Sequence, residues 1–161
     1  MKTRFALATA IAVAAISVPA VSSANGTVVC EIMFGVGAAA DGVVAVDTVD
    51  FTVVYAGIHG SFVDEDGASQ CSVEQSSVTI SAFDGCRENF SECDPKTKEL
   101  RVAMMAGPSG ITLPSQLGSC RFATVAAPSA LDFDLVVNPS LAVGSGNSVV
   151  PQVDILDITC S

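Results

Sequence analysis

The chain has 161 residues, of which 50% are hydrophobic and 15% are charged, and its 17 acidic residues outnumber seven Lys and Arg. The formal charge of −10 argues against nucleic acid as a partner, because proteins bind phosphate backbones mainly through clustered cations. The length suits one domain with a single hydrophobic core.

A cleavable secretory signal peptide is predicted over residues 1–24. Lys2 and Arg4 precede an apolar run, and small residues end the segment at Ala24, which is the order of regions in such a signal. The apolar run is shorter than the roughly 20 residues of a membrane-spanning helix, so we expect export without membrane insertion. The exported domain would comprise residues 25–161 and would be secreted, either extracellular or periplasmic.

The pattern of the exported part predicts mainly β-strands. Residues 46–56 alternate between an apolar and a more polar set, which indicates a strand with one buried face. The apolar set consists of Val49, Phe51, Val53 and Tyr55. Further strands are predicted at residues 27–36, 77–83, 100–106, 119–125, 131–137 and 153–160.

The strand predicted at 131–137 has the same alternation. Leu131, Phe133, Leu135 and Val137 are expected to point inward, and Asp132 and Asp134 outward. Such alternation is typical of antiparallel sheets with one face in water.

Clusters of Gly, Ser, Asp, Asn and Pro separate these strands, as expected of turns. No convincing helix is predicted, since Pro95 interrupts the one long polar segment, residues 85–100. Eight or nine short strands with regular turns predict an all-β fold, a two-sheet antiparallel β-sandwich of the jelly-roll kind with about nine strands.

Six cysteines lie in the exported part: Cys30, Cys71, Cys86, Cys93, Cys120 and Cys160. An even number in an oxidising compartment favours three disulfides over free thiols, although spacing alone does not choose their pairing. A zinc site is not expected, because there is no C-x-x-C pair and His59 is the only histidine.

Three long segments follow one another in a suggestive order: "VDTVDFTVVYAGIHGSFV", "ELRVAMMAGPSGITLPSQLGSCRFATV" and "LDFDLVVNPSLAVGSGNSVVPQVDILDITC". In the pattern and order of these three segments, the chain resembles a cohesin-like domain, the module of scaffolding proteins in cellulose-degrading assemblies. The resemblance implies a nine-stranded jelly roll with its first and last strands side by side, and it implies no catalysis. The same architecture is similar to that of several carbohydrate-binding modules.

The resemblance also suggests a disulfide pattern. If the first and last strands are neighbours, Cys30 is placed to bond Cys160. Cys86 and Cys93 would close a small loop, which leaves Cys71 to bond Cys120.

Catalytic and metal sites are weakly indicated. His59 has no G-x-S-x-G nucleophile elbow to accompany it, so no catalytic residue and no cofactor are expected. Asp64, Asp66 and Gly67 resemble the middle of an EF-hand calcium loop, but its first and twelfth positions would then be Phe62 and Val73, where the loop needs carboxylates. Asp64, Glu65 and Asp66 are the candidate ligands of an irregular site. An irregular calcium site and an acidic hairpin turn both stay open as interpretations.

Carbohydrate binding is only weakly indicated, and one loop has two interpretations. The chain has no Trp and its one Tyr is predicted to be buried, which disfavours a flat polysaccharide-binding strip. A site for soluble glycans could use Asn89, Asn138 or Asn147. The loop "GPSGITLPSQLG", residues 107–118, is interpreted as a connection between strands, with the rim of a protein-binding surface as the alternative.

The sequence therefore predicts a non-catalytic secreted binding module that resembles cohesin. We expect its partner to be a dockerin-type or cell-surface protein. The alternatives are a carbohydrate-binding module that acts in polysaccharide recognition and catabolism, and a structural envelope or matrix protein.

Overall fold

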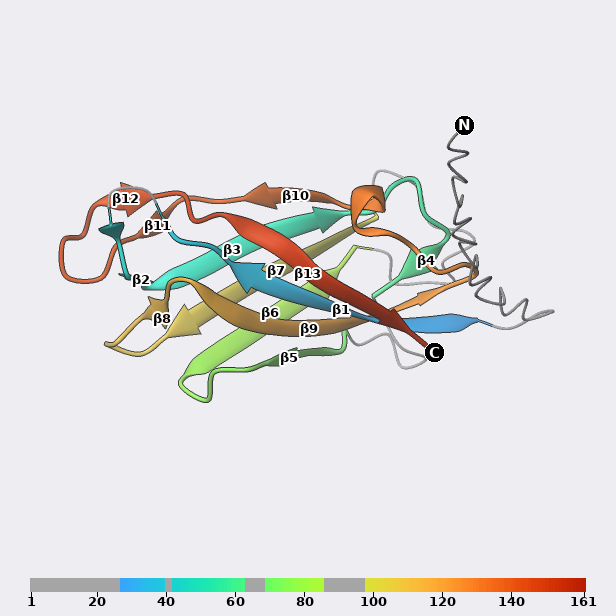
Figure 1. The fold of residues 1–161 in the computed structure, drawn as a ribbon, viewed down its shortest axis with the longest axis horizontal. Helices are drawn as coiled ribbons and strands as arrows, with labels where there is room; N and C mark the ends of the chain where they lie inside the picture. Colours follow the sequence, from blue (N-terminus) through green and yellow to red (C-terminus); the bar gives the residue numbers. More distant parts are fainter. Residues whose placement is uncertain (1–26, 40–41, 63–68, 86–97) are drawn as a thin grey trace, which may run out of the picture.

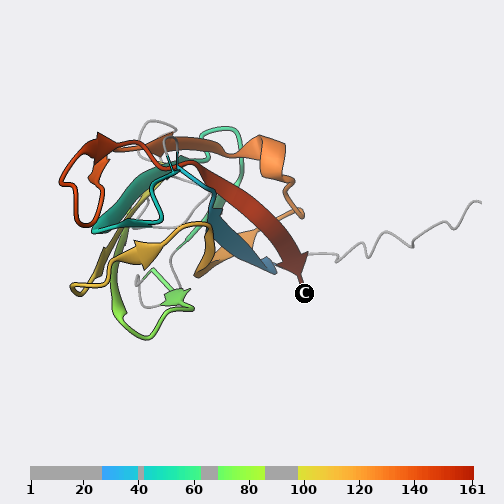
Figure 2. The same ribbon diagram turned by 60° about the vertical axis from the view of Figure 1, so that its left-hand side comes forward.

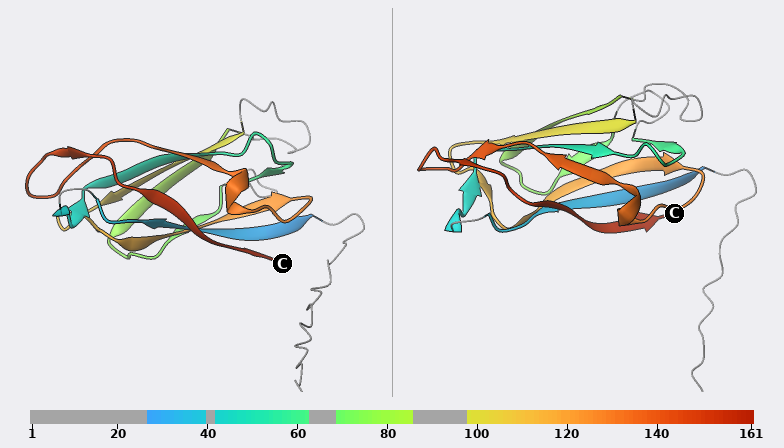
Figure 3. Two further views of the ribbon diagram at one scale, coloured as in Figure 1. Left: turned by 45° about the horizontal axis from the view of Figure 1, so that its top comes forward. Right: turned by 90° about the horizontal axis from the view of Figure 1, so that it is seen from above.

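The computed structural model describes residues 27–39, 42–62, 69–85 and 98–161 and folds as a β-sandwich (Figure 1). Two antiparallel sheets face each other, and the view from above in Figure 3 separates the two layers. Together they contain nine strands in the described residues, so the predicted two-sheet fold is confirmed. The predicted signal peptide, residues 1–24, lies outside the described residues.

The five-stranded sheet has β1 and β9 at its centre. In order it contains β13 (Val153–Cys160), β1 (Val28–Val36) and β9 (Ser115–Thr124), and then β4 (Gly60–Ser61) and β5 (Cys71–Val73), which both pair with β9. The first and last strands are thus neighbours in the sheet, and all of the pairs are antiparallel.

The four-stranded sheet has β3 and β7 at its centre. Its order is β10 (Asp134–Val137), β3 (Thr48–Val54), β7 (Glu99–Ala106) and β6 (Val78–Asp84). The chain crosses between the two sheets at most of its connections, as in a jelly roll.

Two pairs of two-residue strands lie at one end of the sandwich, on the left in Figure 1. They are β2 (Ala45–Val46) with β8 (Ile111–Thr112), and β11 (Ser140–Leu141) with β12 (Ser148–Val149). Asp47 fastens this end, because its Oδ1 accepts hydrogen bonds from the Ser140 hydroxyl (2.9 Å) and the Leu141 N–H (3.1 Å). Burial would raise the pKa of Asp47, but these bonds outweigh it and lower the pKa below its ordinary value.

The core lies between the sheets and is built from the residues that the strand alternation points inward. Val49, Phe51, Val53 and Tyr55 are all fully buried, as the sequence predicts. At one end of the core, aromatic rings pack edge to face or tilted, with centroids 4.7 to 6.2 Å apart. This cluster consists of Tyr55, Phe62, Phe122 and Phe133, and it supplies apolar area that the short strands alone lack.

The starts of two strands, β9 and β10, differ from the predictions by three residues or more. Leu131 is 95% exposed and belongs to a short 3-10 helix, Ala130–Asp132, rather than to an inward face. The Ser129 N–H donates to Asp132 Oδ2 over 2.7 Å, which turns the chain before β10 can begin. β9 begins at Ser115, earlier than predicted, and β10 begins only at Asp134.

The described cysteines form two disulfides, Cys30–Cys160 and Cys71–Cys120, which are the two pairs that the resemblance implies. Each joins residues directly opposite each other on neighbouring antiparallel strands. The flanking backbone bonds, Val29 with Ser161 and Arg121 with Gln70, make both cysteine pairs non-hydrogen-bonded positions. Side chains are closest at such positions, so a bond can form there. Cys86 and Cys93 lie outside the described residues.

Candidate functional site

The outer face of the four-stranded sheet carries several exposed apolar side chains, and we call it the β3–β7 face. Met105 on β7 is 60% exposed and Val136 on β10 is 55% exposed. Phe83, on the edge strand β6, is 46% exposed. Between them lie smaller side chains, Thr48, Asp50, Thr52, Thr79, Ser81 and Ala103.

The register aligns these residues in rows across the sheet. One row runs from Val136 through Thr52 and Arg101 to Phe83, and another joins Thr48, Met105 and Thr79. The strands alternate strictly, with their other residues in the core, so the core supports this face from behind. In Figure 2, β3 (teal) lies to the left of β1 (blue), which belongs to the other sheet. Met105, Phe83 and Arg101 are of the residue types that are enriched at protein interfaces.

The charges on the β3–β7 face are mostly negative. Arg101 is its cation, and its Nη2 pairs with Glu99 Oε1 at 2.5 Å. Asp50 and Asp134 add two carboxylates on the same face. A partner surface with spare positive charge would therefore be favoured over a neutral one.

A buried carboxyl, Asp84, holds the end of β6 against the other sheet. Asp84 Oδ1 accepts a hydrogen bond from the Tyr55 hydroxyl (2.5 Å), and its Oδ2 accepts one from the Phe62 N–H (2.6 Å). Asp84 is 2% exposed. Burial, followed by the hydrogen bond to Asp84 and its negative charge, raises the pKa of Tyr55 far above the ordinary value.

Sequence reasoning missed Asp84, although a signal was present. Val78, Ile80, Ala82 and Asp84 occupy the inward positions of β6, so the alternation itself places a carboxyl in the core. A buried carboxyl needs hydrogen-bond donors. The donors come from positions 22 and 29 residues away in sequence, which no local pattern indicates.

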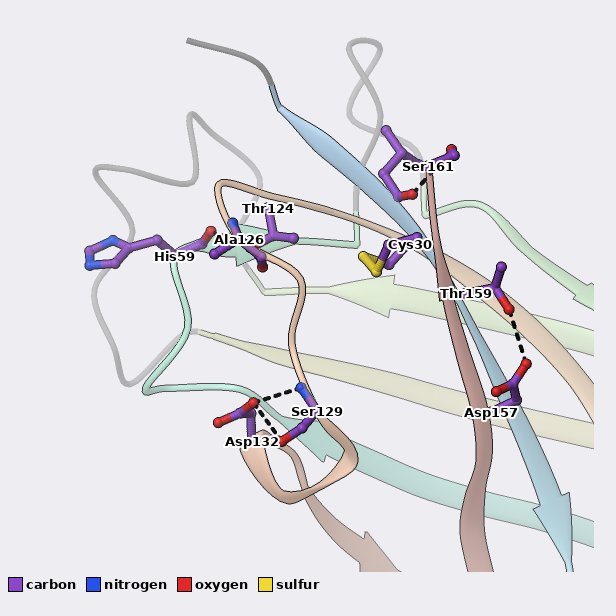
Figure 4. Close-up of a disulfide and its surroundings, with 11 residues drawn as sticks. Cys30, His59, Thr124, Ala126, Ser129, Asp132, Asp157, Thr159 and Ser161 are labelled. Carbon is purple, nitrogen blue, oxygen red and sulfur yellow. Dashed lines mark hydrogen bonds between the residues drawn. A yellow bond between two sulfur atoms is a disulfide. The ribbon is translucent and has the colours of Figure 1, made fainter. Parts of the chain in front are cut away.

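His59 lies on the surface of the loop between β3 and β4 and is exposed. Figure 4 shows its imidazole directed away from Thr124 and Ala126, while its backbone carbonyl accepts a bond from the Thr124 hydroxyl (3.0 Å). In the described structure, His59 thus contributes a hydrogen bond through its backbone carbonyl. Nearby, Lys98 is buried, and its ammonium donates to the Ile58 carbonyl over 2.7 Å.

The loop at 107–118 is built into the core. The Gly110 N–H bonds the Gly107 carbonyl in a turn, and Gly110 has φ of +72°, a conformation that favours glycine. The loop then forms β8 and buries Ile111, Leu113 and Leu117. These contacts account for the segment as a structural connection that closes one end of the sandwich.

The other predicted site residues do not gather. Asn138 and Asn147 are exposed, at the end of β10 and just before β12 respectively. The calcium candidates Asp64, Glu65 and Asp66, like Asn89, lie outside the described residues.

The described residues contain neither a cluster of metal ligands nor a membrane-spanning helix. No three His, Cys, Asp or Glu side chains in these ranges are grouped closely enough to hold a metal ion. No helix in these ranges is long and apolar enough to cross a membrane. The two disulfides indicate an oxidising environment for the chain.

Comparison with known proteins gave no relative: no protein-family model, no curated protein and no solved structure matches the chain. By its structure, the chain is a disulfide-bonded β-sandwich with an exposed, partly apolar sheet face.

Proposed function

We propose that the chain is an exported, non-catalytic binding module that associates with another secreted or cell-surface protein through the β3–β7 face. The observation that carries the proposal is the exposure of Met105 and Val136 on the outer face of one sheet, where the core supports the strands from behind. Methionine and large apolar side chains grouped on one face are favourable for protein contacts, where they can be removed from water.

Two further observations support a module of the cohesin-like kind. The first and last strands lie side by side, and nine strands form the two sheets of the described structure, as the resemblance implies. A dockerin-type protein is therefore a reasonable first partner to test.

The β3–β7 face is less suited to insoluble polysaccharide. Such polymers are gripped by coplanar exposed aromatic rings, and this chain has no Trp, while its one Tyr, Tyr55, is buried. Phe83 is the only aromatic residue on the outer positions of the four described strands. A single ring does not make a strip.

The experiment has two stages. The processed protein, immobilised, is used to capture proteins from spent culture medium, and a captured protein is identified and purified. Its affinity is then measured for the wild type, for the double variant Met105→Ser/Val136→Ser, and for Leu156→Ser on β13 of the opposite sheet as a control, since Leu156 is as exposed as Val136.

We expect the double variant to bind at least roughly tenfold more weakly, since each truncation removes about 1 kcal/mol or more of apolar burial, and we expect the control to bind normally. Equal affinities for the wild type and the double variant would contradict the proposed face. Failure to capture any protein, together with a specific hit on a glycan array, would contradict protein binding as the function.

A further inference from the structure

A groove lined partly by polar side chains lies on the outer face of the other sheet, across β13, β1, β9 and β5. Its volume is about 650 Å³, within the usual range of small-molecule sites. Figure 4 shows two of its lining residues, Thr159 on β13 and Ser161 just after the strand. The groove is lined by Val29, Glu31, Gln70, Cys71, Ser72, Ser119, Arg121, Thr159 and Ser161.

The strand register places complementary polar groups in one row on the groove floor. Glu31 on β1 stands opposite Arg121 on β9 and, on its other side, opposite Thr159 on β13. The row therefore presents a carboxylate, a guanidinium and a hydroxyl side by side. Four strands that are distant in sequence supply these groups and their neighbours.

Hydrogen bonds within the groove hold these side chains in fixed directions. The Ser119 hydroxyl donates to Glu31 Oε1 over 2.6 Å, and the hydroxyl oxygens of Ser119 and Ser72 are 3.3 Å apart. Arg121 Nη1 donates to Gln70 Oε1 over 2.5 Å. A carboxylate has about four acceptor sites and a guanidinium five donors, so both groups retain capacity for a ligand. Side chains that are already ordered lose less entropy when a ligand binds.

The chemistry of the lining selects the ligand. One carboxylate opposite one guanidinium gives no net charge, which disfavours both phosphates and simple cations. The Ser119 and Thr159 hydroxyls donate to Glu31 and Asp157 and keep acceptor sites on their oxygens, so they match the hydroxyl donors of a sugar. Val29 provides a small apolar contact of the kind that C–H groups of a sugar can cover.

We propose that this groove binds a soluble, uncharged oligosaccharide. Glu31 accepts bonds from sugar hydroxyls, Arg121 donates bonds to sugar oxygens, and Thr159 and Ser119 complete the contacts at the two sides. The groove and the β3–β7 face belong to different sheets, so an oligosaccharide and a protein partner can bind at the same time.

The test is an NMR titration of the processed, isotope-labelled protein with a panel of cellohexaose, xylohexaose, maltohexaose and mannohexaose. We expect at least one panel member to shift the backbone amides of Glu31, Ser119, Arg121 and Thr159. The variant Arg121→Met removes the guanidinium, and Arg101→Met serves as the matched control. Arg101 is also hydrogen-bonded on an outer face, but on the opposite sheet.

We expect Arg121→Met to raise the dissociation constant roughly tenfold or more, because hydrogen bonds from a charged donor are lost, and Arg101→Met to leave it unchanged. The spectrum of each variant away from the substitution reports whether the fold is intact. Absence of shifts in the groove with every panel member, or equal weakening by both variants, would overturn the proposal. Either result leaves the protein-binding proposal standing, since that one depends on Met105 and Val136.

Discussion

At the scale of single residues, the hydrogen bond from the Tyr55 hydroxyl to Asp84 lies within the four-stranded sheet and holds the carboxyl that reaches the other sheet through Phe62, just after β4. Both residues are buried, and the Asp84 carboxyl also accepts the Phe62 N–H. A carboxyl in an apolar core is tolerated only when donors surround it. Tyr55 therefore contributes to stability through both its ring and its hydroxyl.

Tyr55→Phe keeps the ring and removes the donor, so we expect the free energy of unfolding to fall by about 1.5 to 3 kcal/mol. Urea denaturation followed by circular dichroism measures the change. Thr79→Val is the control: it removes an exposed hydroxyl whose bond to the Met105 carbonyl is 3.3 Å long, and we expect a change of about 0.5 kcal/mol or less. A loss at Tyr55 no larger than at Thr79 would show that the buried bond contributes little.

The raised pKa of Tyr55 gives a prediction at alkaline pH. The folded state holds the phenol neutral, whereas the unfolded state ionises it near its ordinary pKa of 10.0. The contribution of Tyr55 to stability is thus complete below pH 10 and falls at higher pH, by about 1.4 kcal/mol per pH unit.

Since Tyr55 is the only Tyr and there is no Trp, ultraviolet absorption follows this one phenol without interference. We expect the absorption of the ionised phenol to appear together with the loss of β-structure, at a pH above 10. A phenol that titrates at pH 10 while the circular dichroism stays native would contradict the buried position of the hydroxyl.

At the scale of elements, the two disulfides join strands that the sheet already pairs. Cys30–Cys160 fixes the edge strand β13 to β1, and Cys71–Cys120 fixes the three-residue strand β5 to β9. A strand as short as β5 has few backbone hydrogen bonds of its own, so a covalent link is a direct way to keep it in the sheet.

We expect replacement of either cysteine pair by Ala to lower the free energy of unfolding by about 2 to 5 kcal/mol. The Cys30–Cys160 bond joins residues 130 positions apart, and the Cys71–Cys120 bond joins residues 49 positions apart. Because the longer loop loses more entropy on closure, loss of Cys30–Cys160 should lower the free energy of unfolding by roughly 0.5 to 1 kcal/mol more. Urea unfolding of the two double variants measures the difference. The reverse order would show that local sheet geometry outweighs loop closure.

The sequence predicted many elements well because their alternation is strict. Residues 153–160 form β13 with the predicted bounds, and Val49, Phe51 and Val53 face inward. The prediction that Leu131 points inward is wrong, because the alternating pattern begins before the strand does. The hydrogen bond from the Ser129 N–H to Asp132 forms a turn there instead. The start of β9 was missed since Pro114 and Gly118 resemble loop residues, yet Gly118 lies within the strand.

At the scale of the whole molecule, the sandwich presents two different faces. One carries the exposed apolar side chains Met105 and Val136, and the other has a groove that contains Glu31 and Arg121. Neither could be located from the sequence, because each is assembled by strands that lie far apart in the chain and meet only through the sheet order. The sequence did indicate the class of fold on which such faces are built.

The β3–β7 face is the surface that we propose to bind a protein. The most direct test is hydrogen–deuterium exchange of the processed chain, alone and in complex with the partner captured from culture medium. We predict that the added protection falls on β3, β7 and β10, with the segment around Met105 included. Protection confined to β1, β9 and β13 would contradict the claim.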